Sequence, residues 1–223
     1  MSTPFSRQID SSFLYQSKGH KEAFGRLQLM VENNHLGVLT GEMGSGKSTL
    51  IRHLFQNLDA KRYFPIYMSM TGLKLRDFYG ELLRHVGEEI PFSLAKAKRV
   101  WSESLESRRA QGDKPLIVVV DEAQEMSPSM LAELRFVINH QMDSCSLFPF
   151  ILVGQSEFRR TLRLKKYEAI AQRIPMQYHL TGLSPEETIA YPAPDADGKP
   201  DSTHVCKRVP ALMFMRPPRA FPG

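Results

Sequence analysis

The sequence predicts an α/β fold built on a parallel sheet, and two stretches carry this prediction. The first is a glycine-rich loop at 41–49, which lies between a short apolar run at 36–40 and a helix-like run at 49–55. The second is the apolar run 117–120, which is rich in β-branched residues. Such a run is typical of a strand buried on both faces of a parallel sheet. Strand-like and helix-like stretches alternate along the chain, which favours the same fold class.

The glycine-rich loop fits the G-x-x-x-x-G-K-[ST] pattern of phosphate-binding loops. Its glycines let successive backbone N–H groups point at one anion, and the following helix start adds free amides and the positive end of its dipole. We expect Lys47 to reach the β- and γ-phosphates of a nucleotide and Ser48 to supply a hydroxyl to Mg²⁺. A chance glycine-rich turn before a helix is the alternative. The predicted nucleotide contacts are Gly41-Glu42-Met43-Gly44-Ser45-Gly46-Lys47-Ser48-Thr49.

Two carboxylates, Asp121 and Glu122, directly follow the apolar run 117–120. Open α/β sheets bind their ligands at the carboxyl ends of the strands, so this pair is well placed for chemistry. We expect Asp121 to hold Mg²⁺, directly or through its waters, and Glu122 to polarise the attacking water. The alternative is a pair of solvated turn carboxylates.

Gln155 ends a second buried-type strand and would lie level with the acidic pair in a parallel sheet. There it would sense or orient the γ-phosphate, and a simple strand-end turn is the alternative.

Shortly after Gln155 comes the densest group of cations in the chain, Arg159, Arg160, Arg163, Lys165 and Lys166. Such a cluster suits contact with the phosphates of DNA. A solvated helix surface is the alternative.

Composition and charge bound the class of protein. The chain has 223 residues, of which 42% are hydrophobic and 24% charged, as expected for a soluble globular domain with a substantial core. No apolar run approaches the roughly 20 residues that cross a bilayer, and the N-terminus lacks the apolar core of a signal peptide. Cys145 and Cys206 suggest neither a disulfide framework nor a metal site, so we expect a cytoplasmic location. The net charge of +5 permits contact with nucleic acid without demonstrating it.

The motifs resemble, in order and spacing, those of the AAA+ ATPases. More narrowly, the chain resembles the ExeA/GspA-type branch, which is itself similar to the TniB and TnsC transposition ATPases. The likeness covers about residues 5–190. It rests on the phosphate loop, the strand 117–122, the strand 152–155, the segment 172–174, and on Phe13-Leu14-Tyr15, His20-Lys21-Glu22-Ala23, Leu39-Thr40-Gly41-Glu42, Asp121-Glu122-Ala123-Gln124, Glu133-Leu134-Arg135 and Leu183-Ser184-Pro185-Glu186-Glu187-Thr188.

The resemblance implies a five-stranded parallel sheet, in the order 5-1-4-3-2, between helices. It makes Lys47 and Ser48 part of Walker A, and Asp121 and Glu122 the Walker B pair. It also implies ATP and Mg²⁺ as cofactors. The segment from Phe13 to His20 either lines an adenine pocket or only leads into a helix packed on the domain.

Two further roles follow from the resemblance alone. Gln155 stands at the sensor-1 position, where other AAA+ proteins often carry Asn or Thr. Arg173 stands at the position that supplies an arginine finger to a neighbouring subunit's nucleotide, which implies a homo-oligomer. A surface arginine is the alternative for Arg173.

The end of the chain departs from the family pattern. The family would continue from Ser184 into a small helical lid, but residues 192–223 hold seven of the chain's fifteen prolines. A proline inside a helix costs about 3 kcal/mol or more, so we expect the lid to be missing or disrupted. The prediction is an AAA+ core over 1–190 and an irregular proline-rich tail over 191–223. A frameshift near Tyr191 or a truncated copy would explain it, and a natural flexible tail is the alternative.

Three functions are compatible with these features. The first is an ATPase accessory to DNA transposition, with DNA and a transposase as partners. The second is a secretion-assembly ATPase of the ExeA/GspA type, a role that in its family needs a membrane segment and an envelope domain, neither of which is evident in this sequence. The third is a nucleotide-binding remnant that hydrolyses ATP poorly because its lid is lost.

Overall fold

The computed structural model describes residues 17–138, 148–183, 187, 192–194 and 200–205. The chain divides into two compact units. One is Lys18–Gly182, which lies within the predicted core 1–190. The other combines Met1–Ser17 with Leu183–Gly223. Residues 13–15, most of 184–191, Cys145 and Cys206 lie outside the described residues, so the expectations placed on them stay predictions.

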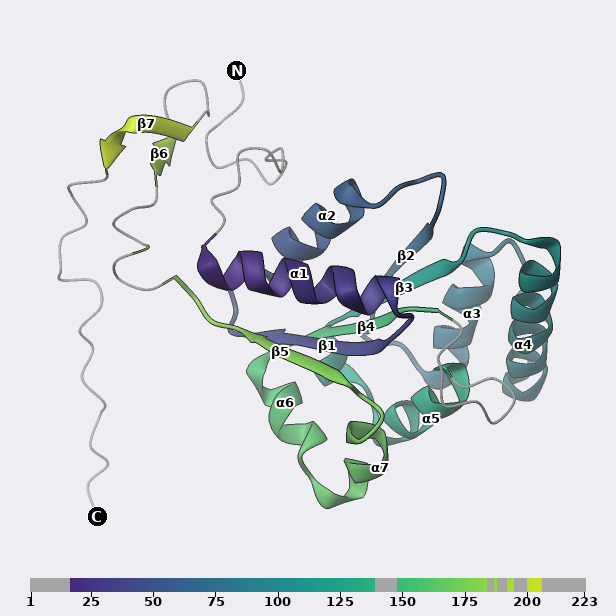
Figure 1. Ribbon diagram of the computed structural model, residues 1–223. Coiled ribbons are helices and arrows are strands. Elements are labelled where there is room, and N and C mark those ends of the chain that lie inside the picture. The colour runs from purple at the N-terminus through teal and green to yellow at the C-terminus, as the bar shows by residue number, and fades with distance from the viewer. Residues whose placement is uncertain (1–16, 139–147, 184–186, 188–191, 195–199, 206–223) are drawn as a thin grey trace, which may run out of the picture. The chain divides into compact units, whose positions relative to one another are not determined.

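A five-stranded sheet forms the centre of the larger unit (Figure 1). Its order is β2-β3-β4-β1-β5, and every neighbouring pair is parallel. This order, taken from the other edge, is the predicted 5-1-4-3-2, so the fold-class prediction is confirmed. The strands are β1 (Leu36–Gly41), β2 (Phe64–Ser69), β3 (Leu116–Asp121), β4 (Phe150–Gly154) and β5 (Met176–Leu180).

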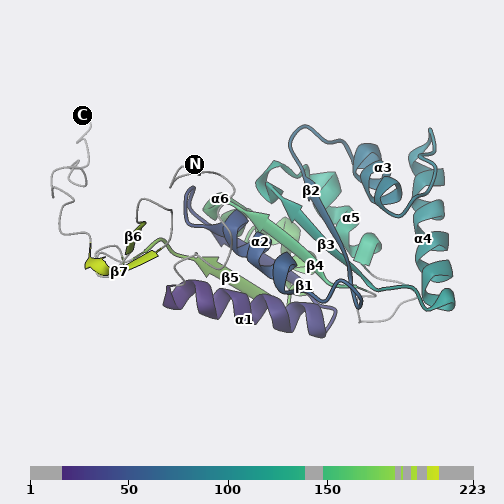
Figure 2. The ribbon, with the colours of Figure 1, turned by 90° about the horizontal axis from the view of Figure 1, so that it is seen from above.

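Helices cover both faces of the sheet, as Figures 1 and 2 show. The helices α1 and α2 pack on one face, and α3 to α7 belong to the other side of the sheet or to its β2 end. Two short 3₁₀ turns, η2 (Ala123–Glu125) and η3 (Lys165–Tyr167), connect elements on this second side. The helices are α1 (Lys18–Glu32), α2 (Lys47–Asn57), α3 (Leu75–His85), α4 (Leu94–Gln111), α5 (Pro128–Ile138), α6 (Ser156–Leu162) and α7 (Glu168–Ala171).

The central strand β3 is buried along its whole length. Ile117 and Val119 join the apolar core under α1 and α2, whereas Val118 and Val120 join the core on the opposite face. Successive side chains of a strand point to opposite faces, so a run that is apolar at every position needs a cover on both. The prediction from the β-branched run is therefore confirmed, and the acidic end of β3 is fixed by two packed layers.

The smaller unit contains two short antiparallel strands, β6 (Pro192–Pro194) and β7 (Pro200–Val205). They differ from the irregular tail predicted for 191–223. Proline has no N–H to donate and is tolerated only at sheet edges, and in a two-stranded ribbon both strands are edges. The proline-rich composition thus excludes a lid helix here without excluding a ribbon.

Across the described ranges, no helix has both the length and the apolar character required to cross a membrane.

Candidate functional site

The phosphate loop lies between β1 and α2, as the sequence predicts. Strand β1 ends at Gly41, and α2 begins at Lys47. Gly44 and Gly46 have φ of 80° and 90°, a region that strains any residue with a β-carbon. A β-carbon on Gly46 would also lie only 2.5 Å from the Nε2 atom of His20. The loop conformation therefore requires glycine at these positions, and it leaves the first amides of α2 free for an anion.

Lys47 folds back over the loop from which it projects. Its Nζ atom donates hydrogen bonds of 2.8 Å each to the carbonyl oxygens of Gly41 and Glu42. Partial burial lowers the pKa of the Lys47 ammonium, and the nearby carboxylates of Asp121 and Glu122 oppose this shift. The predicted phosphate-binding lysine and the predicted acidic pair thus lie in one electrostatic environment.

Asp121 is the last residue of β3, and only 8% of it is exposed. Its Oδ1 atom accepts a 2.8 Å hydrogen bond from the backbone N–H of Glu122. Its Oδ2 atom accepts a 2.6 Å hydrogen bond from the hydroxyl of Tyr67. Burial and this hydrogen bond raise the pKa of Tyr67. The carboxylate is therefore held at both oxygens, and the Tyr67 contact is one that sequence reasoning missed.

Glu122 has a backbone conformation that is rare for residues other than glycine, with φ of 55°. Such strain persists only where the surroundings fix it, and it is common at functional sites. The side-chain amide of Gln124 donates a short hydrogen bond to Oε2 of Glu122. The Oε1 atom of Gln124 accepts a 3.1 Å hydrogen bond from the backbone N–H of Gln155. Gln124 therefore links Glu122 to the end of β4.

The position of Gln155 agrees with the sequence prediction. In the ladder between β1 and β4, Thr40 pairs with Gly154, so Gln155 follows β4 at the level of the phosphate loop. Next to it, the hydroxyl of Ser156 donates a hydrogen bond to Oε1 of Glu42. Sequence reasoning missed both Gln124 and Ser156 as connecting residues. The signal for Gln124 was present, since an amide two residues after a strand-end carboxylate is within its reach.

Arg173 does not join this cluster. It is exposed and precedes β5. The first residue of β5, Met176, pairs with Gly37, near the amino-terminal end of β1. The phosphate loop follows Gly41, at the other end of β1. Parallel strands rise about 3.3 Å per residue, so Gly37 and Gly41 alone are about 13 Å apart. Arg173 therefore lies near the amino-terminal ends of β1 and β5, whereas the phosphate loop of its own chain follows the carboxyl end of β1.

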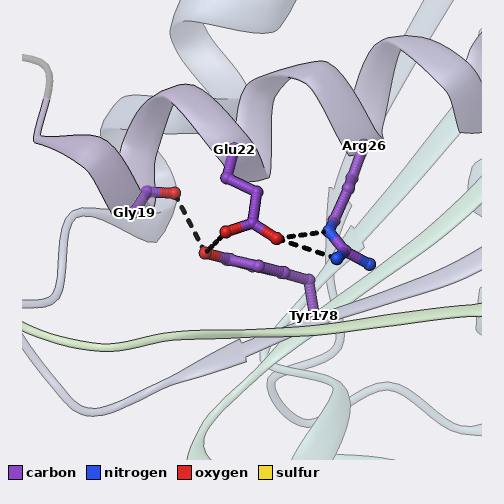
Figure 3. Close-up of polar contacts among 4 residues, drawn as sticks. All are labelled: Gly19, Glu22, Arg26 and Tyr178. Carbon is purple, nitrogen blue, oxygen red and sulfur yellow. Dashed lines mark hydrogen bonds and ion pairs between the residues drawn. The ribbon is translucent and has the colours of Figure 1, made fainter.

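The first turn of α1 is anchored to β5 (Figure 3). The Tyr178 hydroxyl donates a 3.2 Å hydrogen bond to the carbonyl oxygen of Gly19. The guanidinium of Arg26 forms an ion pair of 2.8 Å with Glu22 and lies 5.2 Å from the centre of the Tyr178 ring. Burial and the neighbouring Glu22 raise the pKa of Tyr178. This anchor fixes the turn that carries His20, the residue in contact with the phosphate loop.

The predicted basic cluster lies on α6, on its C-cap residue Arg163 and on η3, and all five of its side chains are exposed. Within the ranges that the structure describes, none of them forms an ion pair with a carboxylate. Lys166 lies over the ring of Tyr167, 4.9 Å from its centre. The cluster is thus a free basic surface rather than a set of internal ion pairs.

The residues at the phosphate loop suit Mg²⁺ and a phosphate chain. Asp121 offers a carboxylate and Ser48, exposed in the first turn of α2, offers a hydroxyl. Mg²⁺ prefers such oxygen ligands and is usually held by one or two carboxylates together with substrate phosphates. The buried hydroxyl of Ser45 has no hydrogen-bond partner among the described residues. Among the residues that the structure describes, no group of three or more His, Cys, Asp or Glu side chains could hold a metal by itself, so the phosphates would have to complete the coordination of Mg²⁺.

Comparison with known proteins agrees with this geometry. The AAA domain family matches residues 31–162. General secretion pathway protein A of Aeromonas hydrophila is 32% identical over 197 residues, which are 84% of this chain and 35% of that protein. The chain thus spans about a third of the length of this relative.

Three solved structures with the same fold are compared with this chain. The ORC2 protein of Aeropyrum pernix, solved as ADPNP–ADP complexes, superposes with a TM-score of 0.61 at 16% identity, over 84% of this chain and 53% of that one. Cdc6p of Pyrobaculum aerophilum gives 0.59 at 15% identity, over 82% and 52%. A Walker-type ATPase of Pyrococcus abyssi gives 0.57 at 18% identity, over 84% and 60%. At these identities the likeness concerns the fold alone.

Proposed function

The chain belongs to the AAA domain family, and from this membership we propose that it binds ATP with Mg²⁺ and hydrolyses the ATP. One observation carries the proposal. Lys47 of the phosphate loop lies within electrostatic reach of both Asp121 and Glu122, the two carboxylates at the end of β3. A phosphate-binding lysine, a metal-binding carboxylate and a second carboxylate for the attacking water are the parts that phosphoryl transfer to water requires.

Each residue of the site has a role in this proposal. The loop amides and Lys47 hold the phosphates, while Ser48 and Asp121 hold Mg²⁺. The ion, when bound, neutralises charge on the β- and γ-phosphates. Glu122 orients the attacking water and accepts its proton. Gln155, which Gln124 connects to Glu122, contacts the γ-phosphate from the end of β4.

We further propose that the active form is a homo-oligomer, because Arg173 lies too far from the phosphate loop of its own chain. In an assembly, an exposed arginine just ahead of β5 can approach the nucleotide of a neighbouring subunit. A positive charge beside the γ-phosphoryl group stabilises the negative charge that develops during transfer. The site would then be completed by two chains.

For the biological process, the relative at 32% identity favours the secretion-assembly function over transposition. The chain covers 35% of that relative, so the role of the whole protein is part of the proposal. A transposition accessory role keeps one specific support, the exposed cluster of five cations on α6 and η3. Neighbouring secretion genes would favour the secretion-assembly role, and a neighbouring integrase-like transposase gene would favour the transposition role.

The direct test is phosphate release by the purified chain with ATP and Mg²⁺, measured beside the binding of a fluorescent ATP analogue. Binding with turnover supports the proposed ATPase. Binding without turnover supports the third function, a nucleotide-binding remnant. No binding at any nucleotide concentration would contradict the proposal altogether.

A further inference from the structure

Tyr67 contacts the proposed metal-binding carboxylate from a neighbouring strand. Its hydroxyl donates a 2.6 Å hydrogen bond to Oδ2 of Asp121, across 54 positions of sequence. Tyr67 lies on β2, at the edge of the sheet, and remains 45% exposed. A large aromatic residue on an edge strand needs no such partner for its own burial, so the contact is better explained by what it does to Asp121.

The parallel ladder brings the two side chains to the same face of the sheet. Tyr67 pairs with Val119, and Ser69 pairs with Asp121, so Tyr67 and Asp121 are diagonal neighbours two positions apart. Val119 belongs to the core under α1 and α2, which is the face that carries the phosphate loop. Diagonal neighbours are about 7–8 Å apart at their backbones, a span that a tyrosine side chain covers. The register of β2 against β3 therefore creates this hydrogen bond.

The two hydrogen bonds on Asp121 restrict its orientation without using all of its capacity to bind. Oδ1 accepts from the N–H of Glu122, and Oδ2 accepts from Tyr67. Each oxygen of an ionised carboxylate has two lone-pair sites, so one site on each remains for a metal ion or its water. Loss of a partner that orients a metal ligand in this way typically lowers metal affinity or activity by about 10–100-fold. The lower end of this range, about tenfold, is the effect expected for a single hydroxyl.

We propose that Tyr67 is a positioning residue that orients Asp121 for Mg²⁺ bound with the nucleotide. The inference rests on the function proposed above, and it goes further by naming a residue of β2 outside both nucleotide motifs. Its prediction is specific to the metal. Loss of the Tyr67 hydroxyl weakens the use of Mg²⁺ and leaves binding of the metal-free nucleotide unchanged.

The experiment compares wild type with Tyr67→Phe, which removes one oxygen and keeps the ring. Affinity for a fluorescent ATP analogue is measured in EDTA and then over a series of Mg²⁺ concentrations. The expected result is equal affinity in EDTA and a rise of about tenfold in the Mg²⁺ concentration for the half-maximal effect. Tyr63→Phe is the matched control, because Tyr63 lies just ahead of β2 and its ring packs against Arg62. Thermal unfolding checks that both variants are folded.

A second comparison separates a positioning role from a general structural one. Asp121→Asn removes the charged ligand, so adding Tyr67→Phe to it should change the Mg²⁺ dependence no further, as coupled residues require. An unchanged Mg²⁺ requirement in Tyr67→Phe would overturn the inference, and so would an equal loss of affinity in EDTA. If wild type itself binds no nucleotide, the proposed function fails. If wild type responds to Mg²⁺ and Tyr67→Phe responds identically, only this inference fails.

Discussion

The Nζ atom of Lys47 lies 2.8 Å from the carbonyl oxygen of Gly41, so the lysine is hydrogen-bonded to the loop whose ligand it is proposed to hold. The same ammonium lies near Asp121 and Glu122, and its burial lowers its pKa. A cation that is already partly desolvated and placed beside free loop amides loses less solvation when a phosphate binds than a fully exposed cation would. This relationship makes Lys47 the first residue to test.

Lys47→Ala should reduce affinity for ATP at least about tenfold, because hydrogen bonds to charged groups contribute about 1.5–3 kcal/mol. Titration with a fluorescent ATP analogue measures the change. Lys114→Ala is the matched control, since Lys114 is exposed and also donates to a backbone carbonyl, that of Ala60. Wild-type affinity in Lys47→Ala would remove this lysine from the site.

Glu122→Gln should leave ATP affinity close to that of wild type and lower turnover by about 100-fold or more, the scale of general base catalysis. The amide keeps the size and most hydrogen bonds of the carboxylate but cannot take a proton from water. Phosphate release under saturating ATP measures the effect. Glu125→Gln, an exposed carboxylate in η2 three positions later, should hydrolyse ATP normally. Unchanged turnover in Glu122→Gln would contradict the assigned role.

Arg173→Ala should bind ATP normally and lose about 10³-fold in turnover if it acts on a neighbour's nucleotide. The decisive measurement mixes Arg173→Ala with Lys47→Ala at an ATP concentration at which each variant alone has little activity. In a mixed assembly, an intact phosphate loop of the first chain can receive Arg173 from the second, so activity should return. Arg163→Ala, another exposed arginine of the same region, serves as the control. A mixture that stays inactive while the chains co-assemble would count against the shared site.

Replacing Arg159, Arg160 and Arg163 with glutamine should weaken DNA binding if the basic cluster is the contact. The logarithm of the binding constant falls with the logarithm of the salt concentration, and each phosphate contact contributes about 0.9 to this slope. Loss of three contacts should therefore reduce the magnitude of the slope by about 2–3. The affinity for duplex DNA is measured over a range of salt concentrations. Replacing Lys96, Arg99 and Arg109 on α4 in the same way removes equal charge elsewhere. A salt slope equal to that of wild type in the α6 variant would exclude this surface.

Tyr79 should make the stability of the fold sensitive to alkaline pH. Its hydroxyl donates a 3.0 Å hydrogen bond to Oε1 of Glu133, which Lys98 contacts at 2.6 Å. Burial and the Glu133 charge raise the pKa of Tyr79 above its ordinary value of about 10. Above that pH the unfolded chain releases the proton and the folded chain keeps it, so stability is present below about pH 10 and falls as the pH rises.

The matching variant is Tyr79→Phe. It should cost about 1.5–3 kcal/mol of unfolding free energy at neutral pH, because the lost hydrogen bond is made to a charged carboxylate. Above about pH 10 its unfolding free energy should fall less with rising pH than that of wild type. Urea unfolding at neutral and alkaline pH measures both quantities. An alkaline loss of stability as large as that of wild type would show that other groups cause it.

The phosphate loop and the acidic pair were predictable because their signals are local. Glycines at fixed positions, a lysine at a helix start and a β-branched run before two carboxylates determine their own backbone geometry over a few residues. The relative order of the strands was accessible only through resemblance to a family. The strands β6 and β7 were not predicted, since proline content excludes helix and does not by itself select between a ribbon and an irregular chain.

The sequence by itself determined the fold class, the phosphate loop and the carboxylates at the end of β3, because each depends on neighbours along the chain. Only the tertiary structure decided which distant side chains complete the site. Tyr67 reaches Asp121 across 54 positions, and Gln124 reaches the amide of Gln155 across 31. These contacts depend on the register of parallel strands, which long crossovers set and no local pattern records. The same register places Arg173 near the amino-terminal end of β5, away from the phosphate loop of its own chain.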